Sequence, residues 1–227
     1  MNERHKRAGL SPKPQPSYHQ TRNPVTPSGR GFRAKFFSPK NRRLVRCESL
    51  LEFDALFLME FARGIRLFEE QPITVEYRLG GRKRTYTPDF SAEWADGRRW
   101  FVEVKPSDRL AEPPNAEKFD ALTQWFASRG EFFLVLTELQ IRPPVRLRQI
   151  RDLLRKRVTS NSNEVAPHLP IVGPGTSIAD MRAGGVDRKL IWQFLADRSL
   201  VCDLDSVIDD QTIVLPYEEA DDVALFI

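Results

Sequence analysis

Two acidic residues and a lysine in the middle of the chain have the types and the spacing of a metal-dependent hydrolytic site. Asp89 lies in Tyr-Thr-Pro-Asp-Phe at 86–90, and Glu103 and Lys105 lie in Val-Glu-Val-Lys at 102–105. Residues two apart in a strand point to the same face, so Glu103 and Lys105 share one side of the predicted sheet. The hairpin that joins the two segments allows Asp89 to lie beside them. Carboxylate oxygens are the ligands that Mg²⁺ and Mn²⁺ prefer.

A metal held at this place could activate water and stabilise the departing oxygen of a phosphodiester. Lys105 could position the water or neutralise charge on the phosphate. The plainer interpretation is a Pro-Asp turn and an ordinary surface pair. Two features favour the site. Pro88 and Asp89 are both disfavoured in a strand, and Glu103 interrupts the apolar run around Trp100.

A further acid could come from a helix that precedes these strands. Glu48 and Glu52 are four residues apart and would share one helical face. Glu52 lies in the apolar run Leu-Leu-Glu-Phe-Asp-Ala-Leu-Phe-Leu, where a carboxylate needs a partner that a metal could provide. The alternative is a solvated helix face, and the sequence alone leaves this open.

The elements that would position these residues follow from hydrophobic spacing. Apolar residues at three-to-four spacing predict helices, and alternation or a short apolar run predicts strands. The run at 131–138 is nearly all apolar, which is typical of a strand covered on both faces. In chain order we expect a helix over 48–64, strands over 73–79, 84–94 and 100–105, a helix over 115–130 and a strand over 131–138, which together make an α/β domain.

A second unit is predicted after Pro143-Pro144. A basic helix over 145–157 precedes a loop, and the helices expected at 176–184 and 186–200 are followed by short strands at 201–204 and 212–215. Two short helices followed by strands are typical of a winged helix-turn-helix. Three bases could serve DNA reading, but small winged domains also bind proteins, and both alternatives stay open. They are Arg182, Arg188 and Lys189.

Charge is strongly segregated along the 227 residues, although the formal net charge is only +4. Residues 1–46 carry twelve Lys or Arg and one acid, and residues 200–227 carry eight acids and no base. We therefore predict a disordered basic arm over 1–31, a catalytic domain over 32–142, a winged-helix-like domain over 143–215 and an acidic tail over 216–227. The arm is expected to face nucleic acid, and the tail is expected to face protein.

The segment 32–46 interleaves phenylalanines with bases, a composition that suits a strip lying on nucleic acid. Alternatively, the aromatic side chains pack onto the domain edge and the bases are only solvated. The candidate DNA-binding residues are Arg30, Arg33, Lys35, Lys40, Arg42 and Arg43.

Several other classes of protein are excluded or disfavoured. No window approaches 18 apolar residues, so we expect no membrane span, and the N-terminus lacks the apolar core of a secretory signal. The two cysteines, Cys47 and Cys202, cannot form a disulfide framework. A reducing, cytoplasmic location is expected, in association with a bacterial nucleoid.

The chain resembles the TnsA family, which comprises the endonuclease subunits of heteromeric transposases from cut-and-paste transposons. The similarity covers about residues 26–140. The matching stretches are the lead-in at 26–49, SLLEFDALFLMEF at 49–61, FEEQP at 68–72, YTPDF at 86–90 and VEVKP at 102–106.

The resemblance implies a restriction-endonuclease-like PD-(D/E)xK catalytic domain followed by a small winged-helix-like α+β domain. By position, the family's helix acid falls on Glu52, with Glu48 as runner-up, and its strand acids fall on Asp89 and Glu103. Its lysine falls on Lys105. The resemblance also implies two Mg²⁺ ions, replaceable by Mn²⁺, and cleavage of double-stranded DNA at the 5′ ends of the element.

The partners implied by the resemblance are a TnsB-like DDE transposase and a TnsC-like AAA+ ATPase, the latter contacted through the C-terminal region. Two other functions stay open. One is a stand-alone defence or repair nuclease of the same fold. The other is a DNA-binding assembly factor without catalysis, in which the acids form structural ion pairs.

Overall fold

A mixed four-stranded sheet organises the molecule. The computed structural model describes residues 32–157 and 171–227. The strands lie in the order β3-β6-β7-β8, in which β3, β6 and β7 are antiparallel neighbours and β8 runs parallel to β7. Their bounds are β3 Ile65–Glu70, β6 Phe90–Trp94, β7 Arg99–Val104 and β8 Phe132–Leu136. A mixed α/β fold was expected, and it is what the chain adopts.

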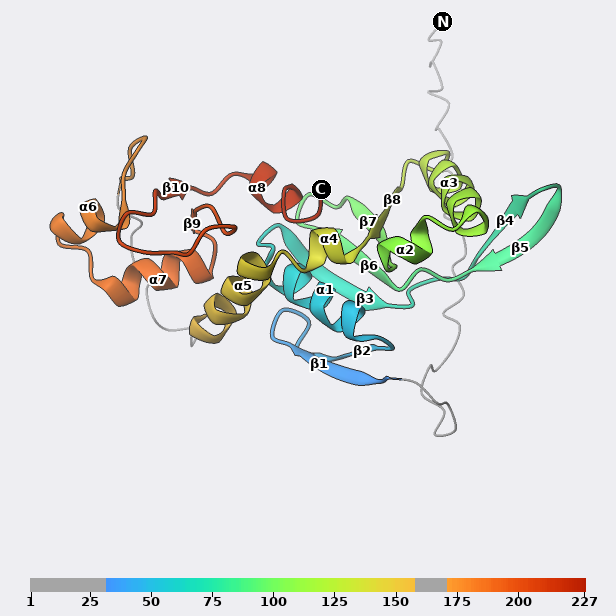
Figure 1. Cartoon of the computed structure of the whole chain (residues 1–227), viewed down its shortest axis with the longest axis horizontal. Coiled ribbons are helices and arrows are strands. Elements are labelled where there is room, and N and C mark those ends of the chain that lie inside the picture. The colour runs from blue at the N-terminus through green and yellow to red at the C-terminus, as the bar shows by residue number, and fades with distance from the viewer. Residues whose placement is uncertain (1–31, 158–170) are drawn as a thin grey trace, which may run out of the picture.

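Helices cover both faces of this sheet (Figure 1). Helix α1, Leu50–Phe61, packs in one hydrophobic cluster with the face that carries Trp100 and Val102. Helix α3, Pro113–Ala127, packs in a second cluster with the face that carries Phe101. Because side chains alternate along a strand, Glu103 lies on the face that α3 covers.

Two short hairpins flank the sheet. Strands β1, Ala34–Ser38, and β2, Arg43–Cys47, pair antiparallel and lie next to α1. Strands β4, Val75–Leu79, and β5, Arg82–Tyr86, pair antiparallel beside α3.

The prediction of one strand over 84–94 is wrong. The segment is divided between β5 and β6, which belong to different sheets, and residues 87–89 lie between them. Pro88 has no N–H to donate to a ladder, so a strand does not continue through it. Asp89 therefore immediately precedes a strand instead of lying within one.

The prediction that the strand at 131–138 is covered on both faces is only partly right. Strand β8 is at the edge of the described sheet, and Phe132 is 43% exposed, although Phe133 and Leu136 are buried. Beyond Phe132, Phe133 packs in the cluster with α3 and Leu136 packs in the cluster with α1, so both faces of the strand are covered there.

Helix α2, Ser107–Leu110, lies between β7 and α3, and α4, Glu138–Ile141, follows β8. The C-terminal part contains the helices α5 Pro144–Lys156, α6 Ile178–Ala183, α7 Arg188–Ala196 and α8 Glu219–Val223. The predicted helices at 145–157, 176–184 and 186–200 are confirmed. The predicted strand pair is shifted, because β9, Leu200–Val201, pairs with β10, Leu215–Pro216.

The core is continuous between the two predicted domains. Ile150 of α5 and Phe194 of α7 belong to the same hydrophobic cluster as α1 and the sheet. The last residues take part as well. Phe226 is buried, and its ring lies edge-on to that of Trp100, with 5.9 Å between ring centroids. The end of the acidic segment thus packs within the chain instead of extending from it as a peptide.

Candidate active site

Asp89 is fixed from both its backbone and its side chain. The backbone N–H of Gln71, which follows β3, donates to the Asp89 carbonyl at 2.8 Å, and Gln71 itself has a left-handed φ of 44°. The Asp89 carboxylate Oδ2 accepts from the backbone N–H of Val104 at 2.8 Å. This second bond holds the Asp89 carboxylate beside the end of β7, between Glu103 and Lys105 in sequence.

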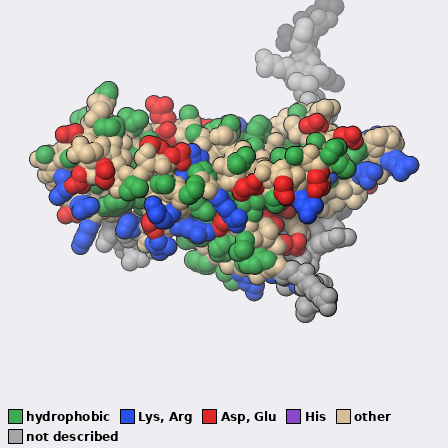
Figure 2. Space-filling model, viewed as in Figure 1, with side chains coloured by type: hydrophobic (Ala, Val, Ile, Leu, Met, Phe, Trp, Pro, Cys, Tyr) green, Lys and Arg blue, Asp and Glu red, His purple; other side chains and the backbone are tan. Residues whose placement is uncertain are grey.

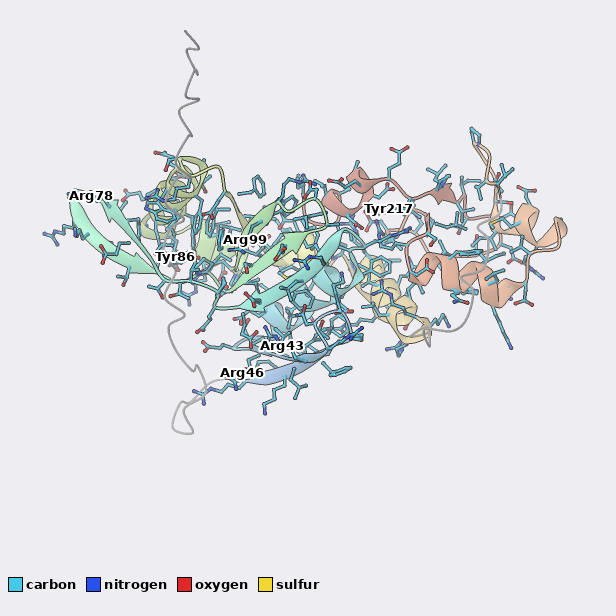
Figure 3. The ribbon with its side chains drawn as sticks, turned by 180° about the vertical axis from the view of Figure 1, so that it is seen from behind. Arg43, Arg46, Arg78, Tyr86, Arg99 and Tyr217 are labelled. Atoms are coloured by element: carbon cyan, nitrogen blue, oxygen red, sulfur yellow. The ribbon has the colours of Figure 1, made fainter. Side chains whose placement is uncertain are left out.

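Glu103 is buried on β7, and its carboxylate Oε2 accepts from the hydroxyl of Tyr86. Tyr86 is the last residue of β5 and is itself buried (Figure 3). The cation of Lys118, on α3, is the largest charged influence that lowers the Glu103 pKa, ahead of Lys105. Three elements therefore converge on this carboxylate.

The pKa shifts of Asp89 and Glu103 show that the two carboxylates lie close together and that nearby positive charges do not fully offset their burial. Burial raises the pKa of Asp89 well above its usual range, and the negative charges of Glu103 and Glu52 raise it further. Burial also raises the pKa of Glu103, against the Tyr86 hydrogen bond and the nearby lysines. Two adjacent acids that resist ionisation together form the kind of pair that a divalent cation would stabilise.

Glu52 lies within electrostatic reach of both acids but is committed to its own helix. Burial raises its pKa, and Oε2 accepts from the backbone N–H of Glu48 at 2.7 Å. The Glu52 N–H in turn donates to the N-cap Ser49 hydroxyl at 3.0 Å. The expectation that Glu48 shares a helical face with Glu52 is wrong, because Glu48 precedes the N-cap and is exposed.

Lys105 follows β7, and its backbone N–H donates to the carbonyl of Leu136 at 2.9 Å, which extends the pairing of β7 with β8. Its side chain is half-exposed, and its charge lowers the pKa of both Asp89 and Glu103. The structure thus brings together Asp89, Glu103 and Lys105 as the sequence predicted.

Sequence reasoning missed Tyr86 and Lys118. The nitrogen of Lys118 lies 4.6 Å from the centre of the Tyr86 ring, and burial lowers the Lys118 pKa against the attraction of Glu103. Tyr86 belongs to the same five-residue stretch as Asp89, which is a usable signal. Lys118 could not be found in this way, because only the packing of α3 on the sheet brings it to the acids.

Two of the three predicted acids have an arrangement that fits a divalent cation. No three Asp, Glu, His or Cys side chains within residues 32–157 and 171–227 lie close enough together to form a ready-made metal cluster. Asp89 and Glu103 nevertheless fit Mg²⁺, which usually takes one or two carboxylates and completes its shell with water and substrate phosphate. Glu52 is on the helix that covers the opposite sheet face, which explains why the three acids are not gathered.

The predicted DNA-binding bases have different environments. Arg30 lies outside the described residues, whereas Arg33, Lys35 and Arg42 are exposed. Arg43 forms an ion pair with Glu70 at 2.7 Å.

Lys40 does not fit the prediction that it binds DNA. Its ammonium donates to the carbonyls of Met59 at 2.9 Å and Ala62 at 2.6 Å, at the C-terminal end of α1. Burial lowers its pKa to about 7. A helix ends in carbonyls that lack intrahelical partners, and Lys40 serves them instead of a phosphate.

The aromatic residues of this segment are divided between both interpretations. Phe36 packs edge-on against Phe53 and Phe57 of α1, as expected of a domain edge. Phe37 is 63% exposed and lies opposite the exposed Leu44 in the hairpin register. The outer face of β1–β2 therefore stays a candidate contact surface, and Figure 3 shows Arg46 on this hairpin.

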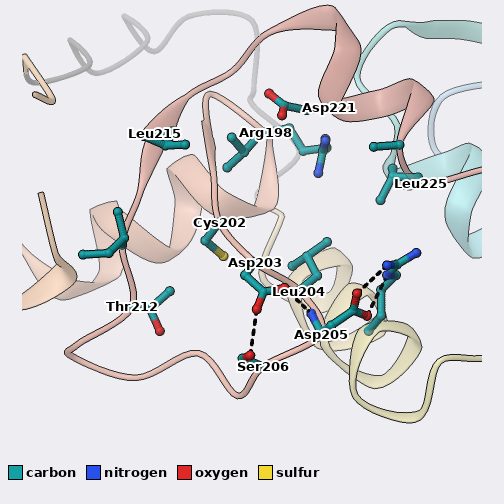
Figure 4. A pocket seen from close by; sticks show the side chains of 14 residues that line it. Arg198, Cys202, Asp203, Leu204, Asp205, Ser206, Thr212, Leu215, Asp221 and Leu225 are labelled. Carbon is teal, nitrogen blue, oxygen red and sulfur yellow. Dashed lines mark hydrogen bonds and ion pairs between the residues drawn. The ribbon is translucent and has the colours of Figure 1, made fainter. Parts of the chain in front are cut away.

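A separate cavity of about 580 Å³ lies in the C-terminal part (Figure 4). Its two central carboxylates already have partners. Asp203 accepts from the Ser206 hydroxyl at 2.7 Å, and Asp205 is paired with Arg146. None of the predicted catalytic residues lines this cavity.

No helix among the described residues is long and apolar enough to cross a membrane. Residues 63–138 match the family described as TnsA-like endonuclease N terminal. This range contains Asp89, Glu103 and Lys105, whereas Glu52 precedes it. No curated protein matches the chain closely.

Proposed function

Because the chain contains a TnsA-like endonuclease domain, we propose that it is a metal-dependent DNA endonuclease of a cut-and-paste transposon. It hydrolyses phosphodiesters at the 5′ ends of the element and leaves 3′-hydroxyl and 5′-phosphate groups. A TnsB-like DDE transposase acts on the other strand.

One observation carries this proposal: the half-buried Asp89 carboxylate accepts a hydrogen bond from the Val104 N–H and adjoins the buried Glu103. Neither acid takes part in an ion pair with any described residue, although thirteen such pairs occur elsewhere in that part of the chain. Burying unpaired carboxylates is costly for folding. This speaks against the alternative in which the acids are structural ion pairs.

Asp89 and Glu103 would hold Mg²⁺, or Mn²⁺ in its place, and Glu52 would supply a ligand for a second ion. When bound, the metal lowers the pKa of a water molecule and stabilises charge on the phosphate oxygens. We also propose that the domain that holds these acids has the restriction-endonuclease-like PD-(D/E)xK fold.

The remaining roles belong to groups around the acids. Lys105, half-exposed at the end of β7, positions the attacking water and neutralises charge on the phosphate. Tyr86 orients Glu103 through its hydroxyl. The N–H of Val104 holds Asp89, so that the acid does not have to be ordered when DNA binds.

The C-terminal part is proposed to be winged-helix-like and to contact a TnsC-like AAA+ ATPase. Arg182 is engaged with Asp210 at 2.6 Å, whereas Arg188 and Lys189 at the start of α7 are exposed. These two bases are therefore the ones available to a partner or to DNA.

The proposal is tested with Asp89→Ala. We expect loss of Mg²⁺-dependent cleavage at the 5′ ends while binding of end DNA persists, because the variant removes a ligand without removing surface bases. Asp108→Ala, on exposed α2, is the matched control and should cut normally. Undiminished cutting by Asp89→Ala would refute the proposal.

A further inference from the structure

The β4–β5 hairpin extends away from the body of the molecule, at one end of its long axis (Figure 1). Its strands are joined by Gly80-Gly81, whose φ angles of 56° and 75° lie in the left-handed region. Such a two-residue turn matches the twist of a hairpin and needs glycine or asparagine. The tip therefore has no side chains, and the ribbon is narrow at its end.

The exposed side chains of this ribbon are mostly basic. Figure 2 shows Lys and Arg side chains gathered at that end of the molecule, and Figure 3 shows Arg78 directed outward there. Among residues 75–86, which the structure describes, Glu76 is the only acid, and it lies 3.7 Å from Lys83, with both side chains of the pair more than 70% exposed. An exposed ion pair of this kind contributes little to the free energy of folding, so Lys83 is not held by Glu76. The exposed bases are Arg78, Arg82, Lys83 and Arg84.

The register distributes these bases over both faces of the ribbon. Arg78 lies opposite Lys83, and directly opposite residues share a face. Arg82 and Arg84 lie on the other face, because side chains alternate along a strand. Tyr77 and Tyr86 on that face are buried against α3 where the hairpin joins the body of the molecule, whereas Arg82 and Arg84 remain exposed. A strip that lies flat on a nucleic acid needs charge on one face only. Charge on both faces suits a ribbon placed between two rows of phosphates.

The end of the ribbon that is attached to the body of the molecule packs next to the catalytic site. Val75, Tyr77 and Tyr86 are buried in the cluster formed with α3. Tyr86 donates to Glu103, and Asp89 follows it by three residues. The packing of these residues thus fixes the direction of the ribbon relative to the two acids.

We propose that the β4–β5 ribbon enters a groove of the duplex next to the scissile phosphate, with Arg78 and Lys83 on one phosphate backbone and Arg82 and Arg84 on the other. This rests on the proposed endonuclease function. The major groove of B-DNA, about 12 Å wide, admits a two-stranded ribbon. Because phosphate contacts carry no sequence information, the ribbon fixes the register of the duplex in the site without selecting its sequence.

Binding is measured in the full chain with Asp89→Asn, so that cleavage does not interfere. A labelled duplex is titrated by fluorescence anisotropy over a range of salt concentrations, with two double variants, Arg78→Ala with Lys83→Ala and Arg82→Ala with Arg84→Ala. Each is expected to reduce the slope of log K against log salt by about 1.8, since each phosphate contact contributes about 0.9. Thermal melting of both variants should be unchanged, because the side chains are exposed.

The matched control is Arg155→Ala with Lys156→Ala, which removes the same charge from exposed positions on α5. Slopes for both hairpin variants equal to that of the control would overturn the inference. A reduced slope for one hairpin variant only would also overturn it, because the ribbon would then lie flat. Cleavage by Asp89→Asn at the unmutated rate would instead refute the endonuclease site, whatever the binding slopes show.

Discussion

At the scale of single residues, Asp89 and Glu103 are poised by neighbours that partly offset their burial. The hydrogen bond from Tyr86 and the charges of Lys118 and Lys105 lower the Glu103 pKa, whereas burial raises it. The balance determines at which pH both acids are ionised and able to hold a cation. Changes to these neighbours should therefore alter the pH dependence of cleavage before they alter the fold.

Tyr86→Phe tests this balance. Removing the hydroxyl removes a donor to the charged form of Glu103, so the Glu103 pKa should rise further. Because the proposed metal site requires Glu103 to be ionised, the acid limb of the cleavage rate against pH should move to higher pH. The profile is measured at saturating Mg²⁺.

Tyr77→Phe is the control for that experiment, since Tyr77 is also buried on the hairpin but does not contact the acids through any described hydrogen bond. An acid limb that stays in place in Tyr86→Phe would show that this tyrosine has only a packing role.

The candidate site was largely predictable from the sequence because its central residues are local. Asp89 is separated from Glu103 by one hairpin, and Lys105 by two further residues. Lys118 could not be predicted, because its approach to Glu103 depends on how α3 packs on the sheet. Lys40 was assigned to DNA because its sequence neighbours are basic, yet its contacts are made with the end of α1.

At the scale of elements, the helices were predicted well and the strands less well. Capping and apolar spacing define α1, which begins after the N-cap Ser49. Strand β3 was not predicted, because an irregularity between Ile65 and Leu67 disturbs the alternation that identifies a strand. The strands of hairpin β1–β2 were not predicted, because the many basic residues in this segment indicated a strip that contacts nucleic acid.

The C-terminal segment is joined to the core by a buried ion pair. Arg198 Nε lies 2.7 Å from Asp222 Oδ1, and both side chains are almost fully buried. Asp222 also accepts from the Tyr217 hydroxyl at 2.7 Å and from the backbone N–H of Gly64. A Cβ at position 64 would lie only 3.0 Å from the Trp94 ring, so glycine permits this close approach.

Asp222→Ala should lower the free energy of unfolding by about 3–5 kcal/mol, because it leaves the Arg198 charge buried without a partner. Chemical denaturation measures the loss. Asp221→Ala, which removes the half-exposed carboxylate that accepts from the Glu218 N–H in the capping box of α8, should cost about 1 kcal/mol. Equal losses in the two variants would mean that the buried pair contributes nothing specific.

At the scale of the whole molecule, the near-neutral net charge of +4 conceals bases and acids with different tasks. Some acids of the C-terminal segment serve the chain's own packing, as Asp222 does. Many of the bases are exposed on hairpins that flank the catalytic sheet. The sequence showed this segregation but not the continuous core, because α5 packs against α1 and α7, and Phe226 packs against Trp100 of the sheet, which joins distant parts of the chain.

Asp89 is proposed to hold the metal ion that supports cleavage, and replacing its oxygen ligand by another atom tests that role. Asp89→Cys replaces a hard oxygen by sulfur, which Mg²⁺ accepts poorly and Mn²⁺ accepts better. The rate of 5′-end cleavage is measured in each metal with the partner transposase present. We predict no cleavage in Mg²⁺ and recovery in Mn²⁺, whereas unmutated rates in Mg²⁺ would show that Asp89 is not a metal ligand.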